Sequence, residues 1–499
     1  MFIACEELRN MAKSCRCRLH ESDDFDSIIE EYSRLYYPHT GTPTDKVHFE
    51  FKLKEAKAIY DALSGEVTAT ISRCLKDIRD ALTDKRSETK IIYPLDVMVT
   101  VILLARLCGN ITAVEVVNFY RARNLELQYL IPGMPRPRFR LSESTVNCVM
   151  RMFSPEEINK LLESYFSAVK TALCEMIKAG ELRERPKLAD KETVSFDGQE
   201  IVSSYRKGES SRRKKGAVGV SVYNSTHKIA LAVKSVLEKN HEVPAFLSLL
   251  PNLDIRGTIV MSDALNSLSE VSTAILRHGA DYLLCLKDNG GNKELRGHLE
   301  AIFNREYAKQ EKSAAISRYL CEKGHGRIDE TLLETLPANL IDERIENPHQ
   351  GINTIVKYTK TRTYLINGKT DKTTTSSRYY VCSLVFSGQN TDRILYSLLD
   401  YWAIEQHHSR LDDPHVFNQD ATRSCSDNYL GNTLGINKIA LNILTWIRHQ
   451  KAVESGKKVP PSYKSIQHML NTSSLTSVFE YLAAYYFEAN TQKSTTTAD

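Results

Sequence analysis

Three acidic residues of this chain, Asp197, Asp263 and Glu405, lie in segments where a carboxylate is costly unless something neutralises it. Their oxygens are hard ligands of the kind that Mg²⁺ and Mn²⁺ prefer. Brought together without a cation, the three would repel one another, which would raise their pKa values. Two divalent ions roughly 3.5–4 Å apart would neutralise them, generate an attacking oxygen and stabilise the leaving oxygen of a phosphodiester. We therefore expect all three to be metal ligands and catalytic residues, although a single buried acid is more often a paired structural residue.

The pattern of the surrounding residues indicates how each acid is positioned. The alternation in VSFDGQE predicts a strand that places Asp197 on one face and ends at Gly198. Asp263 closes TIVMSD, whose apolar run is typical of a strand buried on both faces. Glu405 lies in DRILYSLLDYWAIEQHHSRLDD, a predicted helix that Pro414 stops, on the apolar stripe that faces the core. Two strands and one helix would thus bring the acids to one sheet.

The order of elements after residue 190 predicts an α/β fold. Three strands come first, VSFDGQ, AVGVSVYN and HKIALAVKSV, and a turn at 224–226 joins the last two. A helix over 243–250, the strand TIVMSD, a helix that ends at Gly279 and the strand DYLLCLK follow. This order predicts a mixed sheet covered by helices. Later strand-like runs, separated by polar loops such as NGKTDKTTTSS, indicate a β-rich insertion.

The length of 499 residues predicts two to four domains, because one ordinary core does not grow to this size. Changes in pattern divide the chain into six segments. They are a helical N-terminal extension (1–90), a helical domain that is either a plain bundle or a DNA-binding helix-turn-helix unit (91–185), the first part of the α/β core (186–289), the β-rich insertion (290–392), the last part of the core with the Glu405 helix (393–455) and a C-terminal tail (456–499).

The formal net charge of +4 is small, so any nucleic-acid surface must be local. Directly after Asp197, the run SYRKGESSRRKKG predicts a flexible basic loop, and its position favours phosphate contact over a merely solvated charge run. The segment GHGRIDE, and the second histidine of YWAIEQHH one helical turn after Glu405, offer further contacts with nucleic acid. The candidate DNA-contacting residues are Arg206, Lys207, Arg212, Arg213, Lys214, Lys215, His325, Arg327 and His408.

The cysteines and the apolar runs indicate the cellular compartment in which the protein is expected. The 11 cysteines include no CxxC pair, and scattered thiols are typical of the reducing cytosol. Cys15 and Cys17 form a CxC, but no second Cys or His pair follows at zinc-finger spacing. The N-terminus is polar, which predicts no signal peptide, and the most apolar run, Val97 to Leu107, is about half as long as a membrane span. We therefore expect a cytoplasmic protein without a membrane segment.

Several of these motifs together resemble the DDE transposases of bacterial insertion sequences, in particular the H-repeat-associated family. The matching segments are YPLDVMVTVILLARLCG, VSFDGQE, VMSDALN, DYLLCLKDN, GHGRIDE, YWAIEQHH, FNQDATR and NKIALNIL, which occur in the family's order between about 91 and 450. The resemblance implies a ribonuclease-H-like core preceded by a helical domain, with a β-rich insertion between the second Asp and the Glu.

The resemblance also implies a function. Asp197, Asp263 and Glu405 correspond to the family's catalytic triad, which would hold two Mg²⁺ or Mn²⁺ ions. The chain would bind the terminal inverted repeats of its element in double-stranded DNA, cleave them and join the ends to target DNA. A homodimer in the DNA complex and a cytoplasmic, nucleoid-associated location in a bacterium are implied as well.

Residues around Glu405 depart from the family's pattern. Many relatives have Tyr, Arg and Lys seven before, four before and seven after the Glu, where this chain has Leu398, Tyr401 and Asp412. The departures leave open a domesticated or inactive transposase that only binds DNA. A metal nuclease that cuts without joining is a third possibility, because the sequence does not separate cutting from joining. A zinc site made by His407, His408 and Asp412 is a further alternative.

Overall fold

The computed structural model divides into two compact units, the first made of residues 1–183, 201–217 and 409–499 and the second of residues 184–200 and 218–408. The residues that the structure describes are 65–87, 89, 91–135, 140–165, 191–204, 216–236, 241–288, 290–309, 314–324, 326–366, 369–424, 426–457 and 459–488.

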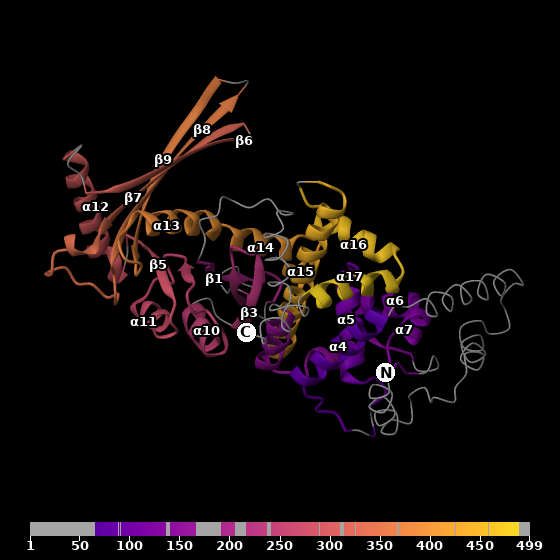
Figure 1. Cartoon of the computed structure of the whole chain (residues 1–499). Coiled ribbons are helices and arrows are strands. Elements are labelled where there is room, and N and C mark those ends of the chain that lie inside the picture. Colours follow the sequence, from indigo (N-terminus) through magenta and orange to yellow (C-terminus); the bar gives the residue numbers. More distant parts are fainter. Residues whose placement is uncertain are drawn as a thin grey trace, which may run out of the picture. The chain divides into compact units, whose positions relative to one another are not determined.

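The second unit contains one nine-stranded sheet, and five of its strands form the α/β core in the order β3-β2-β1-β4-β5 (Figure 1). These strands are β1 (Thr193–Glu200), β2 (Val218–Asn224), β3 (Ile229–Val236), β4 (Ile259–Ser262) and β5 (Asp281–Leu286). β1, β4 and β5 run parallel, whereas β2 is antiparallel to both β1 and β3. This is the ribonuclease-H-like arrangement, so the expected fold class is confirmed. β1 does not end at Gly198, which pairs with Val220.

Helices cover both faces of the core sheet. They are α10 (Glu242–Leu249), α11 (Ser269–Arg277), α12 (Lys293–Ala308), α13 (Gly388–Tyr401) and the start of α14 (Ala403–Asp412). On one face, the ring of Phe196 stacks on that of Phe246 in α10, with centroids 3.7 Å apart. On the other face, the hydroxyl of Thr193 donates to that of Ser397 in α13 over 2.9 Å. Because side chains alternate along a strand, Asp197 lies on the α13 face with Thr193.

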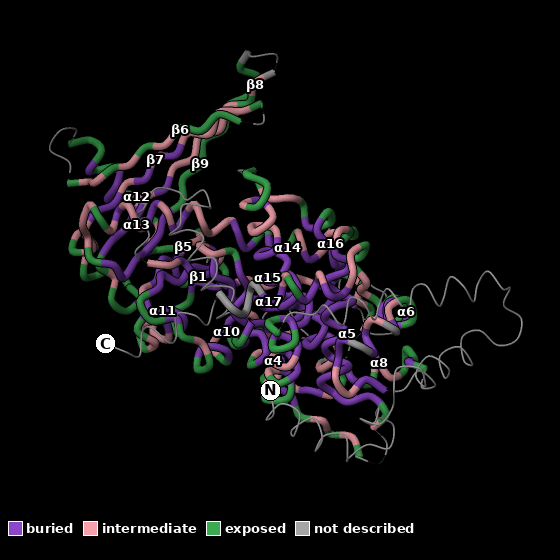
Figure 2. Tube along the Cα trace, turned by 45° about the vertical axis from the view of Figure 1, so that its right-hand side comes forward, coloured by how far each residue is buried: buried purple, intermediate pink, exposed green. Residues whose placement is uncertain are grey.

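Four further strands extend the sheet as a long antiparallel β-arm, in the order β5-β9-β8-β7-β6. They are β6 (Ile316–Gly324), β7 (Arg327–Pro337), β8 (Thr354–Ile366) and β9 (Lys369–Cys382). The part of the β-arm away from the core is mostly exposed (Figure 2). The run NGKTDKTTTSS was expected to be a loop, but from Lys369 it is strand. Its threonines favour extended backbone because they are β-branched, and hydroxyl pairs such as Thr361–Thr375 and Thr363–Thr373 link it to β8.

The helix expected around Glu405 is two helices, α13 and α14, which meet at Trp402. Ile394 and Leu398 of α13 pack in the core, as their spacing predicts. Glu405 is exposed rather than part of that buried stripe. The expectation was wrong because the break at Trp402 interrupts the helical period. α14 ends just before Pro414, where the sequence predicted a stop.

The first unit is a bundle of helices. Among them are α4 (Gly65–Ala81), α5 (Leu95–Leu107), α6 (Ala113–Ala122), α7 (Asn124–Leu130), α8 (Glu143–Met150), α15 (Asp427–Glu454), α16 (Tyr463–Thr472) and α17 (Leu475–Glu488). Every residue of α5 is buried, which agrees with the buried helix expected from its apolar run. No helix in the described part of the chain is both long enough and apolar enough to cross a membrane.

Two segments of this bundle differ from the expected domain plan. Residues 463–488 were expected to belong to a tail, but they form α16 and α17, whose apolar side chains such as Leu470 and Phe479 are fully buried. α15 was expected to complete the α/β core, yet it belongs to the first unit. Both helices are short, and α16 follows a Pro-rich segment of the kind that is typical of a loop or tail.

Candidate active site

Asp197 and Asp263 lie beside each other where the parallel pairing of β1 and β4 ends. The last paired positions of β1 and β4 join Phe196 to Ser262, and the two aspartates are the next residues. Neighbouring strands are about 4.8 Å apart, so the two backbones are close at this point. Asp263 is the first residue after β4, and its carboxylate accepts the N–H of Leu265 at 3.0 Å, which starts a turn. Parallel pairing thus brings together two acids that are distant in sequence.

Electrostatic interactions connect Glu405 with Asp197 and Asp263. Burial, together with repulsion by Glu242, Asp263 and Glu405, raises the pKa of Asp197 to about 7, against a backbone hydrogen bond. Partial burial also raises the pKa of Glu405, opposed by the charge of Arg378 and assisted by that of Asp263. Asp263 and Glu405 are therefore both near enough to Asp197 for their charges to act on it.

The hydroxyl of Tyr401, at the end of α13, faces the same group of acids. Burial raises its pKa, and the charges of Asp197, Asp263 and Glu405 raise it further. Among the residues that the structure describes, no three His, Cys, Asp or Glu side chains are close enough together to hold a metal ion as they stand. The acids are therefore neighbours, but not a preassembled set of ligands.

The two histidines of α14 face different partners. His408 is 8% exposed, and its Nδ1 lies 3.6 Å from Oδ2 of Asp197. Its backbone carbonyl accepts the side-chain amide of Gln199 at 3.3 Å, which ties α14 to β1. The ring of His407 lies against that of Tyr223, with centroids 4.5 Å apart. This arrangement places His408 beside the carboxylate site, whereas His407 packs against Tyr223.

Arg378 of β9 brings a positive charge to the acids. Its guanidinium carbon lies 5.5 Å from the centre of the Trp402 ring, within the range of a cation–π contact. Its charge also acts on Glu405, as described above. The insertion therefore contributes a cation to the site of the core, and Trp402 supports it from the joint between α13 and α14.

Glu242, the first residue of α10, is a fourth acid at the site that the sequence analysis missed. Its repulsion of Asp197 is the strongest that any single charge exerts there. In the sequence it precedes the apolar run VPAFLSLL, so it resembles the acid that commonly occupies the first turn of a helix. Only the packing of α10 against β1 reveals its proximity to Asp197.

The residues predicted to contact DNA are placed only in part. Residues 205–215, with the six cations of the basic loop, and His325 lie outside the described residues. Arg327 starts β7, where its Nε lies 3.2 Å from Oδ2 of Asp329. Asp329 also pairs with Lys360 and Arg362 of β8, so three cations surround one acid on the β-arm. The positive charges of this part of the β-arm are therefore largely paired with acids.

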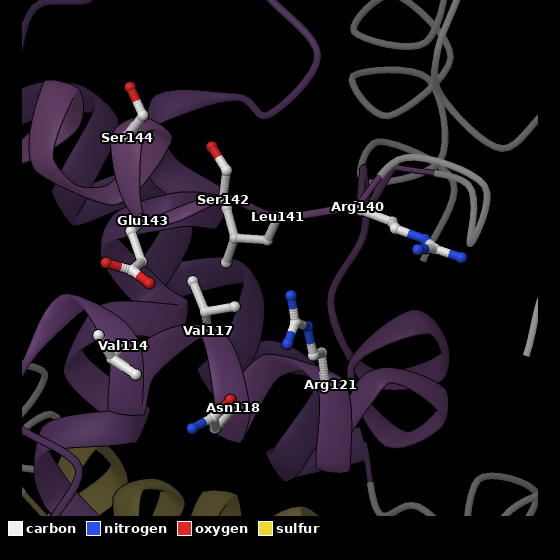
Figure 3. A pocket seen from close by; sticks show the side chains of 9 residues that line it. All are labelled: Val114, Val117, Asn118, Arg121, Arg140, Leu141, Ser142, Glu143 and Ser144. Carbon is white, nitrogen blue, oxygen red and sulfur yellow. The ribbon is translucent and has the colours of Figure 1, made fainter.

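A hollow of about 440 Å³ lies in the first unit and is separate from the acids. It lies between α6 and the start of α8, and Arg121 extends from α6 towards the segment around Ser142 (Figure 3). Its lining is Val114, Val117, Asn118, Arg121, Arg140, Leu141, Ser142, Glu143 and Ser144. The hollow is large enough for more than a few water molecules, but Asp197, Asp263 and Glu405 do not line it.

Comparison with known proteins supports the resemblance seen in the motifs. The chain is 30% identical over 264 residues to a protein of Escherichia coli K12 named "H repeat-associated putative transposase YhhI", covering 51% of this chain and 65% of that protein. It is 32% identical over 167 residues to "H repeat-associated putative transposase YbfD" of the same strain, covering 32% and 60%. The expected similarity to H-repeat-associated transposases is thus confirmed, although the chain spans somewhat less than two thirds of these relatives.

Other comparisons add less. No family model matches the chain. A cryo-EM structure of the piggyBac transposase synaptic complex with hairpin DNA has 12% sequence identity and a TM-score of 0.34, covering 87% of this chain and 85% of that one.

Proposed function

We propose that this chain is a DDE-type DNA transposase that binds terminal inverted repeats, cleaves the DNA at their ends and joins the 3′-hydroxyl to target DNA. The observation that supports this most is the placement of Asp197 and Asp263 side by side where the parallel pairing of β1 and β4 ends, with the charge of Glu405 acting on Asp197. The similarity to H repeat-associated transposases supports the choice of reaction. A DNA substrate in a bacterium would place the protein in the cytoplasm, at the nucleoid.

The acids suit a divalent cation as the partner of this reaction. Most of the nearby donors are carboxylate oxygens, with Nδ1 of His408 beside them, and repulsion by the other acids raises the pKa of Asp197 on top of the effect of burial. A cation would relieve that repulsion by drawing the acids together. Asp197, Asp263 and Glu405 would then hold Mg²⁺ or Mn²⁺, in our proposal two ions. Bound there, such ions generate the attacking oxygen and stabilise the leaving one.

The remaining residues of the site would position the DNA and the acids. His408 lies against Asp197 and would keep that carboxylate oriented, while Gln199 anchors the helix that carries Glu405. Arg378 would contact a phosphate beside the scissile bond, where many relatives use an Arg at the position of Tyr401. The basic loop and the β-arm around Arg327 would contact phosphates further away, and a homodimer would hold two DNA ends.

Replacing Arg378 with Ala should weaken binding to duplex DNA, because a cation that contacts phosphate is lost. The slope of log K against log salt should fall by about one, and cleavage should fall by roughly 10- to 100-fold, the usual effect of a charged hydrogen bond worth about 1.5–3 kcal/mol. Filter binding over a series of salt concentrations measures the affinity and its salt slope. Nicking of end-bearing DNA measures the cleavage.

Arg344→Ala is the matched control, because Arg344 is exposed and pairs with Asp342 away from the acids. It should leave both measurements unchanged. Arg378→Lys should recover the salt slope but only part of the cleavage, since Lys lacks the planar group that stacks on Trp402. If Arg378→Ala and Arg344→Ala behave alike, Arg378 has no part in binding DNA.

The experiment that tests the function itself uses DNA from the gene's own surroundings. Duplexes that carry the inverted repeats flanking the gene should be nicked at the repeat ends in Mg²⁺ and joined to a second duplex. Duplexes of scrambled sequence should not. Nicking without joining would indicate a metal nuclease, and binding without nicking would indicate a domesticated or inactive transposase.

A further inference from the structure

The turn that follows Asp263 exposes its apolar side chains and buries its polar ones. Leu265 is 55% exposed and Leu268 is 45% exposed, whereas Asn266 and Ser267 between them are 4% and 0% exposed. Leucines that are exposed singly are common on protein surfaces and need no explanation. Here two of them belong to one turn, and the polar residues that would ordinarily face water are buried instead.

Hydrogen bonds from other elements hold the turn in this orientation. The side-chain amide of Asn266 donates to Oε2 of Glu242 in α10 at 3.0 Å. The carbonyl of Ser267 accepts the side-chain amide of Asn292 at 2.8 Å, and Oδ1 of Asn292 lies 3.0 Å from Nε2 of His349. Asn292 and His349 are themselves buried. Buried partners therefore fix which side of the turn faces solvent.

The same turn is tied to Asp263. The backbone N–H of Leu265 donates to Oδ1 of Asp263 at 3.0 Å, and the backbone N–H of Asn266 donates to its carbonyl at 3.0 Å. The hydroxyl of Ser267 donates to that carbonyl at 3.2 Å, and α11 begins directly after Leu268. DNA whose scissile phosphate lies at Asp263 would therefore have its neighbouring nucleotides near the two leucines.

We propose that Leu265 and Leu268 form an apolar contact for the bases next to the scissile phosphate at the end of the element. This inference rests on the proposed function, which places that phosphate at Asp263. Leucine is one of the side chains that proteins insert where bases are partly unstacked, because the exposed face of a base is apolar. A protein partner is the competing occupant of this turn. We favour DNA because a protein bound there would cover the acid that the DNA must reach.

A double-mutant cycle between the leucines and the DNA tests this contact. Binding of the full-length protein would be measured in Ca²⁺ to duplexes that carry the inverted-repeat end, either intact or with one base removed at successive positions beside the scissile phosphate. On intact DNA, Leu265→Ala and Leu268→Ala should each weaken binding by roughly 5- to 10-fold, the effect of losing part of a buried leucine side chain. On DNA that lacks the contacted base, the same variants should bind as tightly as the wild type does.

Two further measurements separate an apolar contact with a base from a general loss of affinity. The slope of log K against log salt should be unchanged in both variants, since no cation is lost. The fluorescence of 2-aminopurine placed beside the scissile phosphate should rise when the wild type binds, and most of this rise should be lost in Leu265→Ala. Leu265→Met keeps the apolar surface and should retain the rise. Each variant keeps the backbone N–H that donates to Asp263.

Val385→Ala is the matched control, because Val385 is an apolar residue that is 66% exposed and lies outside this turn. It should behave as the wild type does in every measurement, and melting curves would check that all variants fold. Equal losses on intact DNA and on every DNA that lacks a base would overturn the contact. Sedimentation in which a wild-type dimer becomes a monomer in the leucine variants without DNA would also overturn it, in favour of a protein partner.

The failure of this inference is distinct from the failure of the proposed function. A wild type that nicks end-bearing DNA, but shows no dependence of the leucines on any base, rejects the inference alone. A wild type that neither nicks end-bearing DNA nor prefers it to scrambled DNA rejects the function, and the inference with it.

Discussion

Replacing Asp197, Asp263 or Glu405 with the corresponding amide should reduce cleavage of end-bearing DNA by roughly 10⁴-fold or more, the scale on which enzymes lose activity with a catalytic group. Each amide keeps the shape of the side chain but removes a charged oxygen ligand. Binding to duplex DNA should change little, because phosphate contacts depend on cations elsewhere. Single-turnover nicking measures the cleavage rate and filter binding measures the affinity for DNA, both on the same preparations.

The pattern across variants matters more than any single loss. The three amide variants should be equally inactive, and a double variant no worse than a single one, because the acids act as one unit. Glu270→Gln, which removes an exposed acid of the same unit, should keep wild-type activity. A Glu405→Gln variant that retains substantial cleavage would remove Glu405 from the site and leave the two aspartates.

Asp197→Asn should stabilise the metal-free protein at high pH. The pKa of Asp197 is raised in the folded state to about 7, so the folded form binds the proton more tightly than the unfolded form does. The stability that protonated Asp197 contributes is therefore fully present below the unfolded pKa near 4. It is lost as pH rises through the folded pKa of about 7. One pKa unit corresponds to about 1.4 kcal/mol. With the side chain 24% exposed, we expect Asp197→Asn to gain roughly 1–3 kcal/mol at pH 8.

Urea unfolding in chelator at a series of pH values measures this gain. At pH 4 the variant and the wild type should have similar free energies of unfolding, because Asp197 is protonated there in the folded wild type. The difference should grow between pH 4 and 8, and saturating Mn²⁺ should reverse it by stabilising only the wild type. A difference that is independent of pH would mean that repulsion among the acids is not its cause.

The sequence predicted the parts of the site that strands position. Asp197 and Asp263 follow patterns of alternation and burial that parallel pairing turns into neighbours, and β1 and β4 place them as expected. Local pattern was sufficient because Asp197 lies in, and Asp263 directly follows, a strand with a strong apolar signal. The same reasoning predicted the order of the core elements and hence the α/β fold.

Features that depend on tertiary contacts were not predictable in this way. The exposure of Glu405 depends on a break at Trp402, which the apolar period gives no sign of. Glu242 has the appearance of an ordinary first-turn acid until α10 packs beside Gly198. The strand character of the threonine-rich part of β9 comes from its pairing with β8, since its polarity alone favours a loop.

The metal requirement for cleavage tests the central claim most directly, since it examines the proposed ligands through the reaction itself. Protein freed of metal by a chelator would be mixed with end-bearing DNA, and each metal added singly. The account predicts that Mg²⁺ or Mn²⁺ restores nicking, that Ca²⁺ supports DNA binding without efficient nicking, and that micromolar Zn²⁺ does not restore it. Activity restored by Zn²⁺ and not by Mg²⁺ or Mn²⁺ would contradict the carboxylate site and favour ligands such as His407, His408 and Asp412.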